Sequence, residues 1–321
     1  MDKFLERYSS AIEQAFGEYY RRHTSPEHLY QPVHYILSLG GKRLRPALVL
    51  LAADSFGCPL EKAMPAAMAI EVFHNFSLVH DDIMDRAPLR RGHPTVHCRW
   101  DANTAILSGD VMMIQAYELF ESYQGDTFRE VILAFNRVAR QVCEGQQLDM
   151  DYEKIGDVSQ AQYMEMIRLK TAVLIGGALR IGGIVAEAST RELEALEGFG
   201  TDVGLAFQLT DDYLDTFGDP RTFGKRIGGD ILEGKKTFLY ITARERASRE
   251  EFERAFSLAE EEEKIEAVRD LYRTTGADQA LREQIDRYTE KALAHVDRLP
   301  FSQPYREHYI RLARALVQRK L

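Results

Sequence analysis

The chain contains 321 residues, enough for two average domains or for one large helical domain, so length alone does not decide. Hydrophobic residues make up 45% of it and charged residues 28%, which excludes a disordered chain and a collagen-like or coiled-coil fibre. The net charge of -9 argues against binding nucleic acid or an anionic membrane through overall charge. The three cysteines, Cys58, Cys98 and Cys143, form no CxxC pair, so neither a disulfide framework nor a cysteine zinc site is expected.

The spacing of apolar residues predicts helices along almost the whole chain. Apolar residues recur three and four positions apart, as in the segment 69–83, and no alternating strand pattern competes with them. The predicted helices lie roughly at 3–22, 28–38, 44–56, 60–87, 103–124, 128–150, 160–188, 190–217 and 236–247, with three or four more before the end. No linker interrupts this pattern, so we expect an all-α protein with a single domain over residues 1–321.

Two segments bear on the cellular location of the protein. The first twenty residues mix charged and apolar positions at helical spacing and contain no apolar signal-peptide core. The stretch 169–188 is apolar but is interrupted by Lys170, Arg180 and four glycines, whereas a membrane-spanning helix needs a longer uninterrupted run. We therefore predict no transmembrane segment and a cytoplasmic location, which agrees with the cysteine usage.

A DDxxD motif occurs twice, at residues 81–85 and 211–215, each time near the end of a long apolar helix. At about 100° per residue, the first and last aspartates of each motif lie one turn apart on the same helix face. Like charges at this spacing cost a helix roughly 0.2–0.5 kcal/mol per pair, so folding does not explain them. Magnesium shares its coordination between carboxylates and substrate phosphates. We therefore expect two facing rows of aspartates that form a magnesium-diphosphate site.

Other interpretations of these motifs are weaker. A single acidic motif is usually a solvated helix end, and here the second copy and the accompanying basic loops favour a site. An EF-hand is excluded because neither motif continues with the glycine and glutamate of that calcium loop. His80 and Asp81 together could belong to an HD-type metal hydrolase, but that interpretation leaves the second motif without a role.

Basic residues concentrate in loops that contain glycine. Residues 40–46 place three cations on a turn that enters a helix, where backbone N–H groups favour phosphate. Residues 90–95 follow the first aspartate motif within one short loop, and the Lys170-Thr171 pair and the stretch 225–237 supply further cations. Together these loops predict a site for anions.

Some of these basic residues have simpler interpretations. A single surface cation is usually solvated, and we expect this of Arg43, Arg86 and Lys236. The stretch 229–235 resembles a P-loop, but Lys236 stands where a serine or threonine would bind the metal, and no strand is predicted before it. A nucleotide site is therefore not expected.

In this order and spacing, the motifs resemble those of the trans-isoprenyl diphosphate synthases, the polyprenyl synthetase family. The matching segments run from about residue 35 to 240: GGKRLRP, HDDIMD followed by RRGHPT, the KT pair, FQLTDDYLDTFGD and GKRIGGDILEGKKT. The resemblance implies an all-α bundle of about 10–13 helices around a central cavity, and a homodimer. It also implies an enzyme that condenses isopentenyl diphosphate with an allylic diphosphate, which is dimethylallyl, geranyl or farnesyl diphosphate.

The resemblance also implies roles for individual residues. A cluster of three Mg²⁺ ions would be held by Asp81, Asp82, Asp85, Asp211 and Asp215. The allylic diphosphate would be contacted by Arg90, Lys170, Thr171, Gln208, Lys225 and Lys235. The diphosphate of isopentenyl diphosphate would be held by Lys42, Arg45, His74 and Arg91. Of all these residues, we expect Asp81, Asp85, Lys170, Asp211 and Lys225 to be catalytic. A histidine on an apolar helix such as His74 is more often a core residue, and both interpretations stay open.

The residue types agree with the chemistry. Ionisation of an allylic diphosphate leaves a carbocation and a charged leaving group, so catalysis mainly needs cations around the departing oxygens. The isopentenyl double bond attacks the carbocation, and a proton is then lost. No side chain stands out as a base, in agreement with the family view that the departing pyrophosphate takes this proton. Water must be excluded from the carbocation.

Residues before Asp81 are predicted to set the length of the product. The growing chain should run along the same helix, which rises about 1.5 Å per residue. Ser77, one turn before Asp81, is small enough to admit the chain, whereas Phe73 and Phe76 are bulky enough to stop it. In the family, the positions four and five before the motif govern chain length, and here they are Ser77 and Phe76. We predict a short product, geranylgeranyl first and farnesyl second, although both phenylalanines could simply pack the core.

Two alternatives from other classes stay open. A terpene cyclase also uses an aspartate row and magnesium, but it binds one diphosphate and usually carries an NSE-type second motif. A non-catalytic regulatory partner of a prenyl synthase would share the fold, but its motifs should have decayed. Labelled isopentenyl diphosphate separates the three, because only a synthase elongates a primer.

Overall fold

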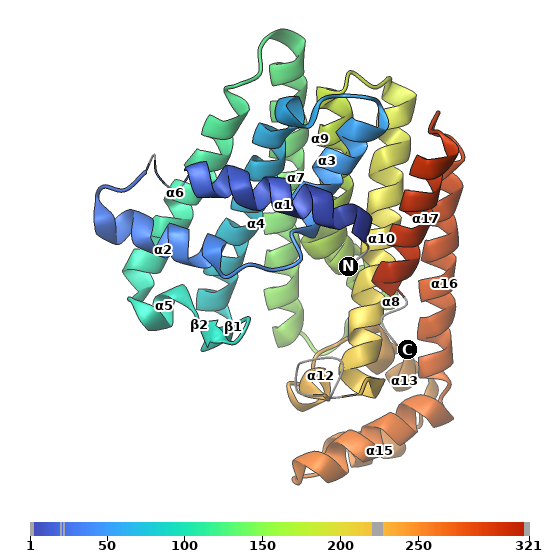
Figure 1. The fold of residues 1–321 in the computed structure, drawn as a ribbon. Helices are drawn as coiled ribbons and strands as arrows, with labels where there is room; N and C mark the ends of the chain where they lie inside the picture. Colours follow the sequence, from blue (N-terminus) through green and yellow to red (C-terminus); the bar gives the residue numbers. More distant parts are fainter. Residues whose placement is uncertain (1–2, 20, 22, 220–226, 318–321) are drawn as a thin grey trace. The chain divides into compact units, whose positions relative to one another are not determined.

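The structure is a computed structural model that describes residues 3–19, 21, 23–219 and 227–317 (Figure 1). Within them lie sixteen α-helices, one π-helical turn and one pair of two-residue strands, so the all-α prediction is confirmed. The helices are more numerous than the 10–13 expected because some are only one turn long and because the predicted helix 160–188 is divided. It consists of α8 (Gln160–Ile167), the π-helical turn η1 (Arg168–Ala172) and α9 (Val173–Val185).

Two compact units make up the chain. Unit 1 comprises Met1–Ala139 and Gly177–Leu196, and unit 2 comprises Arg140–Gly176 and Glu197–Leu321. Three long helices contribute residues to both units: α7 (Gly125–Lys154), α9, and α10 (Thr190–Phe217). The single domain over residues 1–321 stays a prediction.

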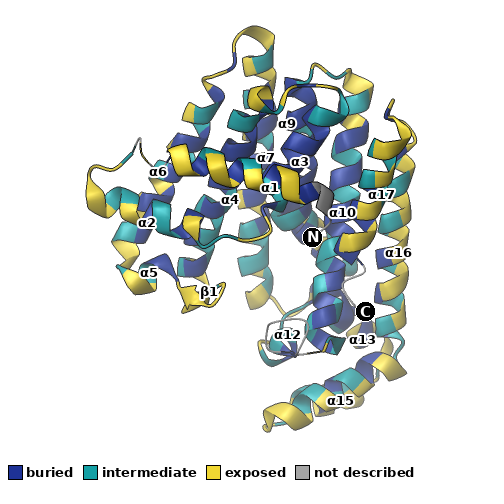
Figure 2. Ribbon diagram, in the orientation of Figure 1, coloured by how far each residue is buried: buried dark blue, intermediate teal, exposed yellow. Residues whose placement is uncertain are grey.

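Unit 1 is built around two buried helices, α3 (Leu44–Ser55) and α4 (Leu60–Met84). Every residue of α3 from Pro46 to Ala53 is buried, as the dark blue of α3 in Figure 2 shows, and α4 packs against both α3 and α6 (Ala102–Phe120). A helix that is apolar on all sides belongs in a core. The surrounding elements of this unit are α1 (Lys3–Tyr19), α2 (Glu27–Ser38), β1 (Leu89–Arg90), β2 (His93–Pro94), α5 (Val96–Arg99) and α6 (Ala102–Phe120).

Unit 2 has its core between α8, η1, the second half of α10 and the helices that follow it. Buried residues of this core include Leu209, Leu239, Val268 and Leu281. The helix α8 begins with a capping box, in which the side chains of Ser159 and Gln162 satisfy each other's backbone N–H groups. The later elements are α12 (Gly229–Leu232), α13 (Phe238–Arg246), α14 (Arg249–Phe256), α15 (Glu261–Thr274), α16 (Ala277–Val296) and α17 (Gln303–Val317).

None of the helices in the described part of the chain has both the length and the apolar character needed to cross a bilayer.

Candidate active site

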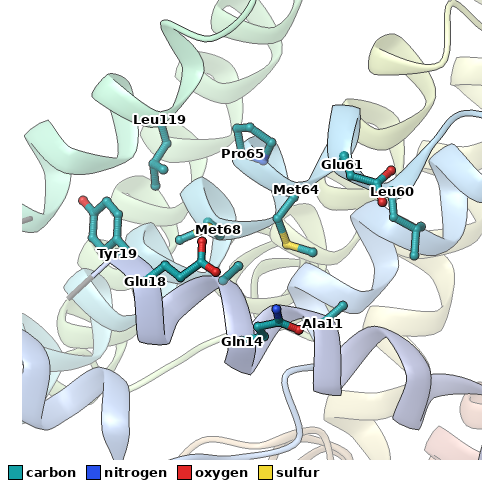
Figure 3. A pocket seen from close by; sticks show the side chains of 11 residues that line it. Ala11, Gln14, Glu18, Tyr19, Leu60, Glu61, Met64, Pro65, Met68 and Leu119 are labelled. Atoms are coloured by element: carbon teal, nitrogen blue, oxygen red, sulfur yellow. The ribbon is translucent and has the colours of Figure 1, made fainter. Parts of the chain in front are cut away.

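A pocket of about 470 Å³ in unit 1 lies between α1, α4 and α6 but does not suit a phosphorylated substrate (Figure 3). Met64, Met68 and Leu119 give it an apolar lining, and Glu18 and Glu61 are the charged residues at its edge. Among its described lining residues none is basic. Because a diphosphate is bound by cations, the candidate site lies instead at the predicted motifs.

The first aspartate motif forms the end of α4. Asp85 is the C-cap residue, and its backbone N–H donates to the carbonyl oxygen of Asp81 at 2.9 Å. The side chain of Asp85 is exposed and that of Asp81 is half-buried, whereas Asp82 is only 1% exposed. Asp81 and Asp85 lie on one helix face because they are four residues apart. Asp82 is directed instead into the protein.

A two-residue β-hairpin holds Arg90 against this motif. The strand β1 pairs antiparallel with β2, and Arg90 at the end of β1 donates from Nε to both carboxylate oxygens of Asp82, at 2.9 and 2.8 Å. The Nη2 atom of Arg90 lies 2.7 Å from Oδ1 of Asp82 and 3.9 Å from Oδ2 of Asp81. The buried carboxylate is thus compensated by a guanidinium, as a buried charge requires.

A second group of cations gathers around the turn at residues 40–41. Nη1 of Arg45 lies 3.0 Å from Nε2 of His74, and Arg91 donates to the carbonyl oxygen of Gly40. Gly41 has a φ of +125°, and a Cβ there would lie 2.8 Å from Cζ of Arg91. Only glycine fits this position, because the backbone conformation and the close guanidinium both disfavour a side chain.

The electrostatics of this group fit an anion. Burial lowers the pKa of Arg45 to about 10, so this side chain stays protonated at neutral pH. Burial, followed by the charges of Arg45 and Arg91, holds the pKa of His74 well below its usual value, so the imidazole is neutral. Nε of Arg45 is buried and has no hydrogen-bond partner among the described residues. A half-buried cation whose Nε is buried and unsatisfied suits a phosphate oxygen.

Arg43 is not the solvated surface cation that its position in the sequence suggested. It is 3% exposed, and its guanidinium lies 2.6 Å from Glu13 and 2.7 Å from Glu71. Its left-handed backbone (φ +44°) opens α3, so it connects α1, α3 and α4. Lys42, next to it, is exposed, and Arg86 is exposed as predicted.

The second aspartate motif lies on α10 in unit 2. Asp211 and Asp215 are half-buried on one helix face, and Asp212 is 3% exposed. Asp212 accepts hydrogen bonds from the hydroxyl of Tyr163 and from Nε2 of Gln208, the latter at 3.1 Å. Burial, followed by the nearby charge of Asp230, raises the pKa of Asp212 to about 7. Both middle aspartates are therefore held by protein side chains, although their partners differ.

Lys170 and Thr171 lie on the π-helical turn η1. Nζ of Lys170 lies 2.5 Å from Oδ2 of Asp149 on α7, and the hydroxyl of Thr171 donates to Oε1 of Gln208 at 3.0 Å. Gly145 on α7 allows this turn to approach, because a Cβ at 145 would lie 2.2 Å from the backbone nitrogen of Lys170. Single π-helical turns inside α-helices are frequent at functional sites.

Residues of the glycine-containing segment 227–237, after α10, form hydrogen bonds and ion pairs beside the second aspartate motif. The backbone N–H of Asp230 donates to Oδ2 of Asp215 at 3.0 Å, and Nζ of Lys235 lies 3.8 Å from Oδ1 of Asp230. Burial lowers the pKa of Lys235, but the carboxylates of Asp230 and Asp149 outweigh this and raise it overall. Lys235 is therefore charged beside the second motif.

The predictions for two further lysines, Lys236 in this segment and Lys225 before it, have different outcomes. Lys236 is half-buried and donates to the carbonyl oxygens of Tyr152 and Glu153 at 2.8 and 3.1 Å, so it is not the solvated cation expected. Lys225 lies outside the described residues, and its predicted role stays a prediction.

The predicted chain-length residues belong to an aromatic cluster in unit 1. Phe73 is fully buried, and its ring centroid lies 5.7 Å from that of Phe76 and 5.2 Å from that of Phe135. Ser77 donates to the carbonyl oxygen of His74 at 2.8 Å and is half-buried. The two phenylalanines therefore form one continuous packed group.

Three residues of these networks were not assigned from the sequence: Tyr163, Asp149 and Asp230. Asp149 is four residues after Gly145, the glycine that contacts η1, and Asp230 follows two glycines. An acidic residue shortly after a glycine is the sequence feature that could have indicated Asp149 and Asp230. One sequence does not reveal which residues these acids contact. The first motif belongs to unit 1 and the second to unit 2, and their facing arrangement stays a prediction.

Two aspartate motifs and several basic loops in an all-α fold define the class of enzymes that act on prenyl diphosphates. The family model named Polyprenyl synthetase matches residues 26–275, so the chain belongs to the polyprenyl synthetase family and is a trans-prenyltransferase. This confirms the resemblance found in the sequence.

Relatives and solved structures agree with this family. The chain is 42% identical over 225 residues to a geranylgeranyl diphosphate synthase of Methanosarcina mazei, a match that covers 70% of this chain and 69% of the relative. A geranylgeranyl pyrophosphate synthase of Geoglobus acetivorans is 38% identical over 304 residues, 92% of each chain. A crystal structure of a geranylgeranyl pyrophosphate synthase is similar with a TM-score of 0.92 at 46% identity, over 98% of this chain and 99% of that one.

A further similar solved structure contains bound ligands. The geranylgeranyl pyrophosphate synthase of Corynebacterium glutamicum, complexed with isoprenyl diphosphate and magnesium, has a TM-score of 0.83 at 28% identity, over 98% of this chain and 96% of that one.

Proposed function

We propose that this short-chain prenyltransferase makes geranylgeranyl diphosphate, by adding isopentenyl diphosphate to dimethylallyl, geranyl or farnesyl diphosphate. The observation that carries the proposal is the packed pair of Phe73 and Phe76, which would stop the growing chain below Asp81. The names of the Methanosarcina and Geoglobus relatives support the same product. Labelled isopentenyl diphosphate with each primer, followed by chromatography of the dephosphorylated products, tests it. A C15 or C25 main product would contradict it.

The same assay separates the proposal from the two other classes. A terpene cyclase would release a cyclic hydrocarbon, and a regulatory partner would show no turnover by itself. Elongation of the primer excludes both.

We infer that divalent magnesium, in a cluster of three ions, is held mainly by Asp81 and Asp85 of unit 1 and by Asp211 and Asp215 of unit 2. These four carboxylates supply the hard oxygen donors that magnesium prefers. Asp82 belongs to the same motif as Asp81 and Asp85, but its oxygens already accept from Arg90, which makes it an anchor for that arginine. When bound, magnesium would neutralise charge on the departing diphosphate.

The protein's own residues would then act on the two substrates. Arg90, Lys170 and Lys235 would hold the allylic diphosphate, together with Thr171, Gln208 and Lys225. Their positive charge favours breaking of the carbon–oxygen bond, because the diphosphate gains negative charge as it leaves. Both electrons of that bond go to the leaving oxygen, and an allylic carbocation remains.

The second diphosphate would be held by Arg45 and Arg91, with Lys42 and the neutral His74 beside them. This arrangement orients the double bond of isopentenyl diphosphate toward the carbocation, so that the new carbon–carbon bond forms within one bound complex. The departing pyrophosphate would accept the proton that is lost.

Phe73→Ala and Phe76→Ala test the predicted stop for the chain. Each should lengthen the main product by one or more five-carbon units, because the removed ring opens space below Ser77. Phe252→Ala in unit 2 is the matched control, since it also removes a packed phenylalanine ring. Unchanged product length in both Phe73→Ala and Phe76→Ala would refute the assignment.

We propose that the enzyme is a homodimer that uses an apolar face of α6. Leu107 and Ile114 are 59% and 56% exposed and lie seven residues apart, which places them on one face of the helix. Leu107→Glu combined with Ile114→Glu should convert the dimer to a monomer in sedimentation velocity. A wild-type monomer, or a double variant that stays dimeric, would contradict the proposal.

The cytoplasmic location is part of the same proposal. All three cysteines are free, as is common in a reducing compartment. Cell fractionation that finds the protein in another compartment would refute it.

A further inference from the structure

His80, directly before the first aspartate motif, has no role in the function proposed above. Its ring points from α4 toward α6, where Nε2 lies 3.2 Å from the carbonyl oxygen of Ile106 and 3.9 Å from Oδ1 of Asp110. Because a carbonyl oxygen only accepts, Nε2 must carry the hydrogen. The imidazole is thus attached to the backbone of the neighbouring helix.

Gly109 makes this attachment possible. A Cβ at position 109 would lie 2.2 Å from Nε2 and 2.5 Å from Cδ2 of the His80 ring, distances that real Cβ atoms do not show. Gly109 is buried within α6, so the ring lies directly on the helix backbone. Any larger residue at 109 would displace the ring.

The His80 ring also contacts Phe76. The two ring centroids lie 4.8 Å apart at an interplanar angle of 63°, and the residues are four apart on α4. Phe76 in turn contacts Phe73, which is fixed edge-on against Phe135 at 81°. Phe76 is half-buried, so it is less confined by the core than Phe73 and depends more on its aromatic neighbours.

We propose that His80, seated on Gly109, is a positioning residue that fixes the ring of Phe76 and thereby sets the length of the prenyl product. The inference rests on the proposed function, in which the growing chain meets Phe76. Without the imidazole, Phe76 can turn into the space beside Gly109, and the chain can extend further before it is stopped. Of the pair that limits the product, Phe76 would be the member whose ring position His80 determines.

Product analysis of His80→Ala, His80→Phe and Gly109→Ala tests this role. We expect His80→Ala to shift the main product by at least one five-carbon unit, whereas His80→Phe, which retains a ring beside Phe76, should keep the wild-type length. Gly109→Ala should change the product distribution, because it displaces the ring. Matched controls are His28→Ala, which is exposed on α2, and Gly17→Ala, which has no neighbour within 4 Å.

The outcomes separate the inference from the proposed function. If the wild type elongates no primer, the proposed function fails. If the wild type elongates but His80→Ala and Gly109→Ala give its product distribution, the inference fails. A merely structural role would lower the melting temperature and the rate while leaving product length unchanged, and this also overturns the inference. Should His80→Ala not fold, His80→Gln carries the same expectation, because it retains an N–H donor for Ile106 but has no ring.

Discussion

Gly145→Ala should displace the π-helical turn that carries Lys170 and Thr171. A Cβ there would lie 2.2 Å from the nitrogen of Lys170 and 2.6 Å from the carbonyl carbon of Leu169, whereas ordinary contact begins at 3.4 Å. Because both neighbours are backbone atoms, the turn must retreat from α7 by about 1.2 Å. The lysine would then lose its alignment with Asp149, which holds it at 2.5 Å.

The expected loss is large in activity and moderate in stability. A misplacement of about 1 Å at a group that positions substrate can cost about 100-fold, and we expect this decrease in kcat/KM for the allylic substrate. Overpacking of this kind costs about 1–3 kcal/mol in the free energy of unfolding, which leaves the protein folded. Initial rates with labelled isopentenyl diphosphate and unfolding in urea measure the two effects.

Gly17→Ala provides the control for this experiment. It makes the same change on an exposed face of α1, where no atom lies within 4 Å, so its rate should match the wild type. If Gly145→Ala also retained the wild-type rate, the π-helical turn would not be needed for catalysis. If it lost activity only because it unfolded, the close packing of α7 and η1 would matter for folding alone.

Three further changes test other parts of the site. Arg90→Ala leaves Asp82 as a buried charge without its guanidinium, so unfolding in urea should show a loss of about 3–5 kcal/mol; a loss under about 1 kcal/mol would contradict the pairing. The pKa of Asp212 is raised to about 7 from 3.8, so the native state should lose stability as pH rises from about 4 through about 7. Asp212→Asn should lack this decrease when melting temperatures are compared at pH 5 and pH 8 in EDTA, and parallel profiles for the two proteins would refute the shift. Arg45→Met should raise KM for isopentenyl diphosphate about 10–100-fold with little change in kcat, because a charged hydrogen bond contributes about 1.5–3 kcal/mol; an unchanged KM would exclude it from that pocket.

Helical periodicity and the repeated aspartates could be recognised because both depend only on spacing along one helix. The helix ending at Met84 and the one spanning Thr190–Phe217 were predicted within a few residues. The π-helical turn at 168–172 could not be predicted in this way, because one extra residue in a turn leaves the apolar pattern nearly unchanged.

The function of individual charges was harder to predict, because it depends on neighbours that are distant in sequence. Asp81 and Asp82 are neighbours in one motif, yet only Asp82 is buried against Arg90, which lies eight residues later in the β-hairpin. The sequence around Arg43 is typical of a solvated loop cation, yet Glu13 and Glu71 lie beside its guanidinium. Such partners belong to other helices, and a single sequence does not reveal which helices meet.

The hairpin at residues 89–94 links the two predicted diphosphate sites through adjacent arginines. Arg90 donates hydrogen bonds to the carboxylate of Asp82, and the next residue, Arg91, donates to the carbonyl oxygen of Gly40 in the turn before α3. Neighbouring side chains of one short hairpin thus contact two different parts of unit 1. Under the proposed roles, the substrate that binds first, at Arg90 or at Arg91, would restrict the neighbouring arginine that must receive the other substrate. The order of substrate addition should therefore be visible in initial-rate patterns when both substrate concentrations are varied.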